Sequence, residues 1–306
     1  MKKIILAGGT GNVGRVLSEE LLRQGYEVII LSRTTKSSNR QNLSYVLWDG
    51  EQLGEWMSVL EGSDTLINLS GQSIQCRFTE KNRRTLTSSR IKPTYILGEA
   101  IRGLKEPPRL WINISGTSIF EGLEQLSDEE STRFADTFLA NLVKEWEKTF
   151  FMFHLPATRQ VCLRLSPVLS KDFGMFKELN LLTRFGLGGK AGNGKQLISW
   201  IHEVDLINLV LWIIHHRDPS SLYHACVPLP VSNKIFMKEL QRVNKISFGL
   251  PLPAFLAKVG AYFKGVESDM ILQTNAVSSS RAVREGFVFK FPTIKEAFLE
   301  LTKHIH

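Results

Sequence analysis

Several features that would place the chain in a special class are missing. The three cysteines, Cys76, Cys162 and Cys226, form no Cys-x-x-Cys pair and are odd in number, so buried thiols in a reduced compartment are expected. The longest nearly apolar run, LINLVLWII, is interrupted by Asn208 and is far shorter than the roughly 20 residues of a membrane-spanning helix. The two lysines near the start precede only a short apolar run, so no signal peptide is expected. These absences favour a cytoplasmic protein with no membrane partner.

A concentrated basic tract is also missing, although the net charge is +8. A basic excess suits nucleic acid, an anionic membrane or a phosphate-bearing ligand. The positive residues are spread along the chain, and no helix-turn-helix or aromatic-basic platform is visible, so no nucleic-acid partner is expected. One local concentration comprises Arg77, Lys81, Arg83, Arg84, Arg90 and Lys92.

Strand-like and helix-like segments alternate over the first 166 residues. Short β-branched runs predict strands, and amphipathic stretches between them predict helices. This alternation indicates an α/β fold with a Rossmann-type, doubly wound parallel sheet covered on both faces. The predicted strands are KKIILAG, EVIILS, LSYVLW, DTLINLSG, RLWINISG and RQVCLRLS, with SLYHAC as a candidate last strand; the main helices span 12–25, 79–104 and 136–150.

The pattern changes after Ser170. We expect residues 170–195 to form a loop on the substrate side, because TRFGLGGKAGNGKQ is rich in glycine and basic residues. Residues 231–284 look mostly helical, with a proline-marked break at LPLPAF. The prediction is therefore an NAD(P)-binding domain over residues 1–230 and a smaller, mainly helical C-terminal substrate domain over residues 231–306.

The stretch ILAGGTGNVG joins the first predicted strand to the first predicted helix. A strand, three glycines spaced by threes and a helix form the arrangement that binds the pyrophosphate of a dinucleotide. Gly8 permits the sharp turn, Gly11 lets the backbone approach the phosphates, and Gly14 allows close packing of the helix. The helix N-terminus adds N–H groups and a partial positive charge. The alternative is a merely structural turn.

The end of the second strand indicates which cofactor is preferred. NAD-preferring sites usually place a carboxylate there, on the ribose 2′-hydroxyl. Here LSRTTK supplies Ser32, Arg33 and Lys36 and no acid. An arginine can bind a 2′-phosphate that a carboxylate would repel, so NADP(H) is favoured over NAD(H). Arg33 as a solvated loop residue is the alternative.

Several longer motifs resemble the extended short-chain dehydrogenase/reductases, and within them the atypical epimerase-family branch (NAD-dependent epimerase/dehydratase-like) with a C-terminal domain of unknown function. The likeness covers essentially the full length. The motifs that carry it are INLSGQSI followed by RFTEKNRRTLTSSR, RFGLGGKAGNGKQLISWIHEVDL, VPLPVSNKIFMKEL and AVREGFVFKFPTIKEAF.

The resemblance implies an NADP site, carried over position by position. Arg83 and Arg90 lie seven residues apart, hence on one helix face beside a crevice that binds an anion; a solvated basic face is the alternative. The implied cofactor residues are Gly8, Gly9, Thr10, Gly11, Asn12, Val13, Gly14, Ser32, Arg33, Leu69, Ser70, Thr85, Arg90 and Val168.

The usual catalytic pair of the superfamily is missing. Typical members use a serine or threonine after the fifth strand and a Tyr-x-x-x-Lys pair on the next helix, in which the tyrosine is the acid or base. Here Phe138 and Leu142 stand where the pair is sought, and Lys144 is rotated to another face. The resembled branch generally lacks the pair, and its Tyr-Tyr-Gly turn is Phe120-Glu121-Gly122 here.

The remaining candidates for catalysis are Ser115, Thr117, Glu121 and His202, and no metal site is indicated. Glu121 as a solvated turn residue and His202 as a core residue are the alternatives, and Asp205 is expected to cap the helix that follows it. Two functions stay open: an NADP(H)-dependent oxidoreductase or epimerase acting on an unknown small polar substrate, and an inactive NADP(H)-binding protein that senses redox state or regulates a partner.

Overall fold

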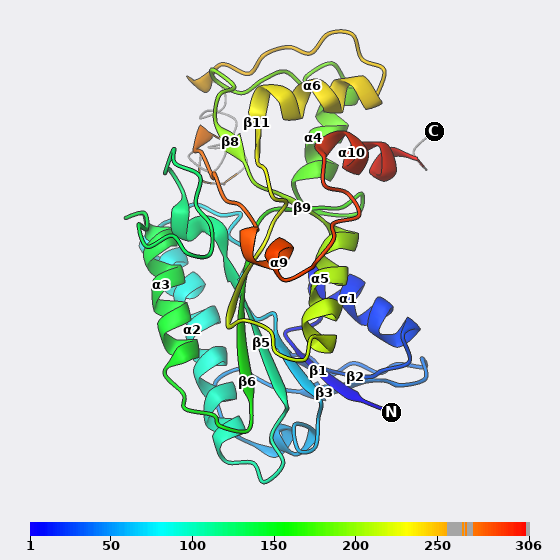
Figure 1. Cartoon of the computed structure of the whole chain (residues 1–306), viewed down its shortest axis with the longest axis vertical. Coiled ribbons are helices and arrows are strands. Elements are labelled where there is room, and N and C mark those ends of the chain that lie inside the picture. The colour runs from blue at the N-terminus through cyan, green and yellow to red at the C-terminus, as the bar shows by residue number, and fades with distance from the viewer. Residues whose placement is uncertain (256–264, 266, 268–271, 304–306) are drawn as a thin grey trace.

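The computed structural model describes residues 1–255, 265, 267 and 272–303. Seven parallel strands form its central sheet in the order β10-β6-β5-β4-β1-β2-β3, which confirms the Rossmann-type prediction (Figure 1). The strands are β1 (Lys3–Ala7), β2 (Glu27–Ser32), β3 (Leu43–Leu47), β4 (Thr65–Asn68), β5 (Leu110–Gly116), β6 (Arg159–Leu165) and β10 (Leu222–Ala225).

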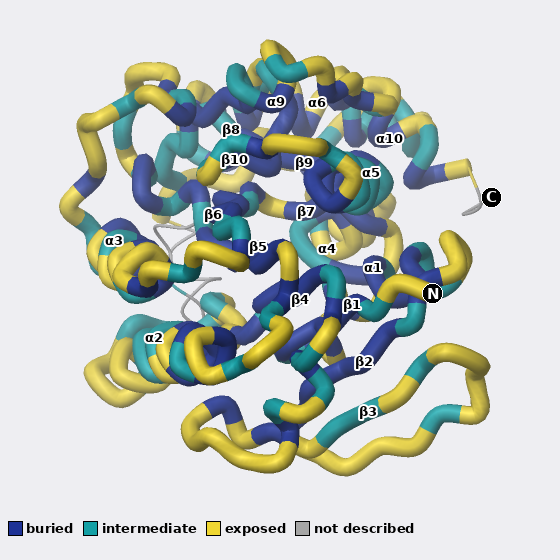
Figure 2. The backbone as a smooth tube through the Cα atoms, turned by 60° about the horizontal axis from the view of Figure 1, so that its bottom comes forward, coloured by how far each residue is buried: buried dark blue, intermediate teal, exposed yellow. Residues whose placement is uncertain are grey.

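Both faces of the sheet are buried, as the near-continuous apolar strands require. In β1, Ile4 and Leu6 belong to one apolar core, whereas Ile5 and Ala7 belong to the other. Successive side chains of a strand point to opposite faces, so each strand contributes to both cores. Figure 2 shows the central strands dark blue, between helices whose outer turns are exposed.

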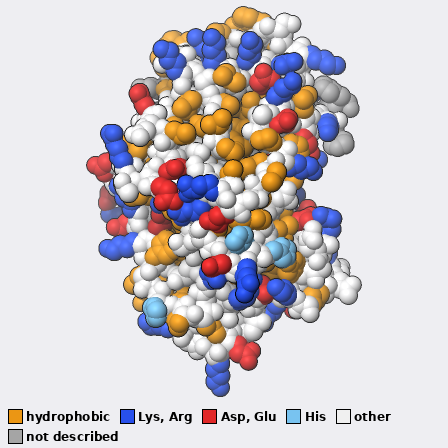
Figure 3. Space-filling model, viewed as in Figure 1, with side chains coloured by type: hydrophobic (Ala, Val, Ile, Leu, Met, Phe, Trp, Pro, Cys, Tyr) orange, Lys and Arg blue, Asp and Glu red, His pale blue; other side chains and the backbone are white. Residues whose placement is uncertain are grey.

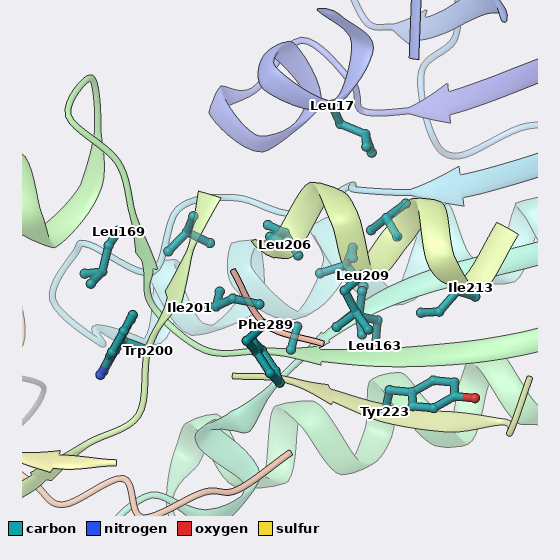
Figure 4. Close-up of a cluster of buried hydrophobic side chains, with 14 of the residues drawn as sticks. Leu17, Leu163, Leu169, Trp200, Ile201, Leu206, Leu209, Ile213, Tyr223 and Phe289 are labelled. Carbon is teal, nitrogen blue, oxygen red and sulfur yellow. The ribbon is translucent and has the colours of Figure 1, made fainter. Parts of the chain in front are cut away.

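Two pairs of helices cover the two faces. Helices α1 (Asn12–Arg23) and α5 (Glu203–His215) contact each other on one face, and α2 (Glu80–Arg102) and α3 (Phe138–Phe151) do so on the other. Leu206, Leu209 and Ile213 of α5 lie in the first core with Leu163 of β6 and Tyr223 of β10 (Figure 4). Two 3-10 helices, η1 (Glu55–Val59) and η2 (Thr117–Phe120), follow β3 and β5.

A second lobe lies beyond the carboxyl ends of the strands, at the top of Figure 1. Phe298 packs on Phe176 and Phe236, with ring centroids 5.3 and 4.9 Å apart, and so joins three helices of this lobe. The lobe and its attachments contain α4 (Gly174–Arg184), α6 (Asn233–Val243), α10 (Ile294–Thr302), the antiparallel pair β8 (Leu197–Ile198) and β11 (Val231–Ser232), and the parallel pair β7 (Val168–Leu169) and β9 (Ile201–His202). Helix α9 (Ser280–Arg284) packs on β10.

Two expectations for this part of the chain are corrected. A loop was expected over residues 170–195, but α4 occupies Gly174–Arg184, because its apolar residue Phe176 finds a buried position in the second lobe. Residues 231–284 were expected to be mostly helical; α6 and α9 are helices, but residues 244–253 contain no helix and residues 274–279 run extended, with bridges at Asn275 and Val277. The predicted helical residues 256–264, 266 and 268–271 lie outside the described residues.

Basic side chains are distributed over the face drawn in Figure 3, with acidic and apolar side chains between them. Among the described residues, no helix is long and apolar enough to cross a membrane. No group of three or more His, Cys, Asp or Glu residues within the described ranges is arranged to hold a metal ion.

Candidate cofactor and substrate site

The glycine loop leads from the carboxyl end of β1 into α1. Gly8 has a φ of +71°, a conformation that favours glycine, and its N–H donates to the Leu31 carbonyl of β2 at 3.0 Å. The Gly9 N–H donates back to the Leu6 carbonyl at 3.3 Å, which closes the turn. Gly11 then serves as the N-cap of α1 without a capping side chain. The N-terminus of α1 is therefore presented at the carboxyl edge of the sheet.

The three spaced glycines have different surroundings. A Cβ on Gly14 would lie 2.3 Å from the Gly9 carbonyl oxygen, so α1 packs directly on the loop. A Cβ on Gly8 would lie 2.9 Å from Ser70 Oγ and 3.0 Å from Ser70 Cα. A Cβ on Gly11 would meet no atom of the chain within 4 Å. Gly8 and Gly14 are thus required by packing, whereas Gly11 faces open space.

The end of β2 places a cation beside this loop. Ser32 is buried, and its Oγ accepts the Thr34 N–H at 3.3 Å, which turns the chain just after the strand. Arg33 is exposed, and no ion pair or hydrogen bond of its side chain is present among the described residues. The neighbouring residues contribute no carboxylate. The arrangement leaves a guanidinium available to an anion.

The turn after β4 packs on the other side of Gly8. The Leu69 N–H donates to the Ala7 carbonyl at 2.8 Å, and the Ser70 N–H donates to Asn68 Oδ1 at 3.1 Å. Ser70 is 9% exposed, and its Oγ has no hydrogen-bond partner in the described part of the chain. Buried hydroxyls normally have a partner, so this orphan atom fits a site that a ligand completes.

Asn68 belongs to a buried polar network that sequence reasoning missed. Its Nδ2 donates to Asn113 Oδ1 at 2.7 Å and to Thr94 Oγ1 at 3.0 Å. The Trp146 indole N–H also donates to Thr94 Oγ1, at 2.8 Å. The network joins β4, β5, α2 and α3 directly beneath Ser70. Asparagines within two apolar strands were the signal that could have revealed it.

Of the residues expected on α2, Arg90 is held by the protein itself. Its guanidinium donates to the Leu86 carbonyl at 3.1 Å and to the Gln72 carbonyl at 2.9 Å, and it lies 5.3 Å from the centre of the Trp146 ring. Burial lowers the pKa of Arg90 to about 10. Arg90 therefore stabilises the loop after β4 through its hydrogen bond to Gln72.

Two other α2 residues differ in their surroundings. Arg83 shares the Arg90 face, as predicted, but it lies over Phe138 of α3 at 4.9 Å and donates to the Phe78 carbonyl. Thr85 is exposed, and its hydroxyl donates to the Lys81 carbonyl at 3.1 Å. On the far side of the sheet, Val168 is 9% exposed and pairs with Ile201.

Ser115 is part of a buried row across three strands. It stands opposite Arg164 in the β5–β6 register, and Arg164 stands opposite His224 in the β6–β10 register. Glu147 of α3 accepts from Ser115 Oγ at 2.7 Å, and Arg164 donates to its two carboxylate oxygens at 2.8 and 2.7 Å. The hydroxyl proton of Ser115 is therefore directed at Glu147. This row was not predicted; an arginine inside a strand and a glutamate on the buried side of a helix were the available signals.

The other expected catalytic residues differ in accessibility. Thr117 is 1% exposed, and its hydroxyl lies 3.5 Å from the Leu165 carbonyl oxygen. Glu121 is half-buried in the turn after η2, where the Thr137 hydroxyl donates to its Oε2 at 3.4 Å. Thr137 is the N-cap of α3, so the Glu121 carboxylate lies at the positive end of that helix. Glu121 is the candidate that combines an acidic group with partial exposure.

His202 has the core position that the sequence left open. It is fully buried, its Nδ1 accepts the Val204 N–H at 3.1 Å, and its Nε2 lies 2.9 Å from Glu300 Oε2. Burial lowers the pKa of His202, although the nearby Glu300 carboxylate acts in the opposite direction. Because Nδ1 accepts, the proton stands on Nε2 and is donated to Glu300.

The expectation that Asp205 caps α5 is wrong. His202 is the N-cap, and Asp205 instead accepts the backbone N–H groups of Lys290 and Phe291 at 2.7 and 2.9 Å. Sequence spacing alone could not place the chain around residue 290 against the start of α5. Both carboxylate oxygens of Asp205 are therefore used to hold the C-terminal segment.

Apolar side chains occupy the two positions where the tyrosine and lysine of the catalytic pair are sought. Phe138 packs on Phe78 with ring centroids 5.2 Å apart, and Leu142 is 5% exposed within the same apolar cluster. Lys144 donates to the Ala135 carbonyl at 2.7 Å and to Asn141 Oδ1 at 3.0 Å. No hydroxyl or amine thus replaces the pair on α3.

Comparison with known proteins identifies relatives that match this fold over its whole length. Residues 4–140 match the model of the NAD dependent epimerase/dehydratase family. The Epimerase family protein SA0724 of Staphylococcus aureus (strain N315) is 30% identical over 304 residues, which cover 99% of this chain and 100% of the relative.

Solved structures agree. The human epimerase family protein SDR39U1, solved with NADPH, is 27% identical with a TM-score of 0.88, and the match covers 99% of each chain. A nucleoside-diphosphate sugar epimerase from Corynebacterium glutamicum is 26% identical with a TM-score of 0.75, covering 98% of this chain and 58% of that one. Less similar structures, 13% and 16% identical, were solved with NAD and show the fold alone. The chain therefore has an NAD(P)-binding fold and belongs to the NAD-dependent epimerase/dehydratase family.

Proposed function

We propose that the chain binds NADP(H) at the glycine loop and uses it as an oxidoreductase or epimerase on a small polar substrate. The observation that carries this proposal is the open space at Gly11, in a loop whose Gly8 packs on the unpartnered Ser70 hydroxyl, together with the exposed Arg33 just after β2. SDR39U1, which matches the whole chain, was solved with NADPH. When bound, the nicotinamide would supply the hydride or accept it.

Each part of the site has its own task in this proposal. The N–H groups at the start of α1 face the pyrophosphate, and Arg33 with Ser32 meets the 2′-phosphate. Leu69, Ser70 and Val168 border the cofactor, Arg90 fixes the loop after β4, and Thr85 lies at its outer edge. The loop positions are Gly8, Gly9, Thr10, Gly11, Asn12, Val13 and Gly14.

Arg33→Ala tests the cofactor assignment. Losing a charge-assisted contact should weaken NADPH binding by about 2 kcal/mol and leave NADH binding nearly unchanged. Arg40→Ala, a change at an exposed arginine further along the same loop, is the matched control. Fluorescence titration with both cofactors measures the effect, and an equal loss for both would reject this role of Arg33.

Glu121 is the residue to which we assign proton transfer. Its carboxylate is partly exposed in the turn after β5, near the start of α3, where the superfamily places its tyrosine. Ser115 is committed to Glu147, and His202 is engaged at both ring nitrogens. Once a substrate is found by following NADPH oxidation over a metabolite panel, Glu121→Gln should reduce kcat far more than cofactor affinity.

A binding protein without turnover is the second candidate. The apolar packing of Phe138 and Leu142, where the acid and its lysine are sought, favours it. Tight NADPH binding without oxidation by any member of the panel would support this candidate. Turnover that Glu121→Gln abolishes would exclude it.

The proposal extends to the domain division around the site and to the cellular location. We place the substrate between an NAD(P)-binding domain over residues 1–230 and a C-terminal domain over residues 231–306, to which α4 is added by its packing on α6. A cytoplasmic location is supported by the cysteines, since Cys76, Cys162 and Cys226 are all free and two of them are buried.

A further inference from the structure

An extended segment of the C-terminal part crosses the carboxyl end of β5. The Asn275 N–H donates to the Leu197 carbonyl at 2.8 Å, and the Ser199 N–H donates to the Asn275 carbonyl at 3.1 Å. On the other side, the Gly122 N–H donates to the Thr274 carbonyl at 2.7 Å. The segment is thus held between β8 and the turn that carries Glu121, and its position is defined from both sides.

The side chain of Asn275 leaves an acceptor unused. Its Nδ2 donates to the Thr117 carbonyl at 3.3 Å, whereas its Oδ1 is buried and has no partner within the described ranges. Rotating the amide by half a turn would set Oδ1 against the Thr117 oxygen, two acceptors facing each other. The Thr117 carbonyl therefore determines that the unpartnered atom is an oxygen.

Gln273 provides a second unused acceptor. Its Oε1 is also buried without a partner among the residues that the structure describes. Gln273 lies two residues before Asn275, at the bend where the extended segment begins. With Ser70 Oγ, three unpartnered polar atoms belong to residues at or across the carboxyl edge of the sheet.

Leaving such atoms unpaired has a cost. A buried acceptor without a donor destabilises a protein by about 1–3 kcal/mol. Native structures contain few of them, and each calls for an explanation such as a bound ligand or water. For each of these oxygens the missing partner is a hydrogen-bond donor, and Asn275 lies beside Thr117, in the segment bonded to the turn that carries Glu121.

We propose that Gln273 and Asn275 form an acceptor subsite for a substrate group that donates hydrogen bonds, namely a hydroxyl or an amino group. The inference rests on the proposed function, because it places the substrate beside Thr117 and Glu121. A carboxylate or phosphate is excluded from this subsite, since its oxygens would face amide oxygens that are acceptors themselves. The substrate end next to β5 is therefore hydroxylated or aminated and carries no negative charge.

Saturation-transfer NMR on the full chain with NADP⁺ tests the subsite. The probes are glucose for the hydroxyl arm, glucosamine for the amino arm and tetrahydropyran, a ring ether that donates no hydrogen bond. Transfer to glucose or glucosamine is expected, with none to tetrahydropyran. Asn275→Leu and, separately, Gln273→Leu should each reduce the transfer at least fivefold. Asn244→Leu is the control, because its amide bonds Asn180 and the Leu240 carbonyl within the second lobe.

The outcomes separate the two proposals. NADPH binding is measured by fluorescence on the same wild-type sample, and its absence would refute the proposed function. NADPH binding without transfer to glucose or glucosamine would overturn the acceptor subsite alone. Equal transfer in wild type and in either leucine variant would also overturn it, since the orphan oxygens would then hold only water. If one leucine variant fails to fold, the other decides.

Discussion

Two alanine substitutions in the glycine loop separate its packing role from its ligand role. Gly14→Ala inserts a methyl group 2.3 Å from the Gly9 carbonyl oxygen, about 1 Å inside ordinary contact. The obstacle is backbone, so α1 itself must shift. Overpacking of this kind costs about 3 kcal/mol at the upper end of its range, and the better helix propensity of alanine offsets about 1 kcal/mol. We expect a net loss of about 2 kcal/mol in the free energy of unfolding.

Gly11→Ala should have the opposite profile. Gly11 has a φ of −75° and a ψ of 177°, which any residue can adopt, and its added methyl group meets nothing within 4 Å. Reduced freedom of the unfolded chain and a poorer N-cap nearly cancel, so stability should change by less than about 0.5 kcal/mol. NADPH affinity should fall at least tenfold, or about 1.4 kcal/mol, because the methyl group occupies the proposed pyrophosphate position.

Urea unfolding followed by circular dichroism measures the first effect, and titration of NADPH fluorescence measures the second. A folded Gly11→Ala variant with wild-type NADPH affinity would refute the proposed cofactor position. Wild-type stability of Gly14→Ala would refute the packing argument. The two substitutions control for each other, since both are Gly→Ala changes three residues apart.

Three further predictions follow from buried groups. Burial lowers the pKa of His224 to about 3, so between about pH 6.5 and 3 the ring is protonated only in the unfolded chain. The free energy of unfolding should therefore fall with decreasing pH in this range, by up to about 1.4 kcal/mol per pH unit. Urea unfolding at several pH values should show a flatter slope for His224→Gln. Glu147→Gln leaves the Arg164 cation unpaired and should lower the free energy of unfolding by about 3–5 kcal/mol. Glu147→Leu combined with Arg164→Met should recover most of this stability, and additive losses from the two changes would contradict the prediction. The double variant Phe138→Tyr with Leu142→Lys should lower the free energy of unfolding, because the lysine enters an apolar cluster. It should turn over carbonyl compounds or sugar nucleotides only weakly. Robust turnover would show that the rest of the site is intact.

Local sequence patterns were sufficient to predict the central sheet and the glycine loop. The strands of the sheet are short runs rich in apolar residues, and helices stand between β1 and β2, between β4 and β5, and between β5 and β6, a pattern typical of parallel pairing. The glycines of the loop and the start of α1 lie within one stretch of ten residues. Such features are determined by neighbours in the sequence, which is why they could be predicted without coordinates.

The C-terminal part was predicted less well, because its structure depends on distant partners. Helix α4 is stabilised through Phe176 by Phe298, more than a hundred residues later. Asp205 has a capping residue's position in the sequence, but the backbone of Lys290 and Phe291 claims its carboxylate. Patterns of period and spacing carry no information about such contacts.

The sequence by itself determined that the chain has a Rossmann-type sheet and a glycine loop, and that it lacks the Tyr-x-x-x-Lys pair. Only the tertiary structure decided which polar residues are used internally and which remain available. Strand register sets Ser115 beside Arg164, and helix packing brings Glu147 to both, so a predicted catalytic serine is bound within the core. The same folding brings Asn275 to Thr117. Strand register and helix packing bring residues into contact that lie far apart in the sequence, and no local pattern encodes these contacts.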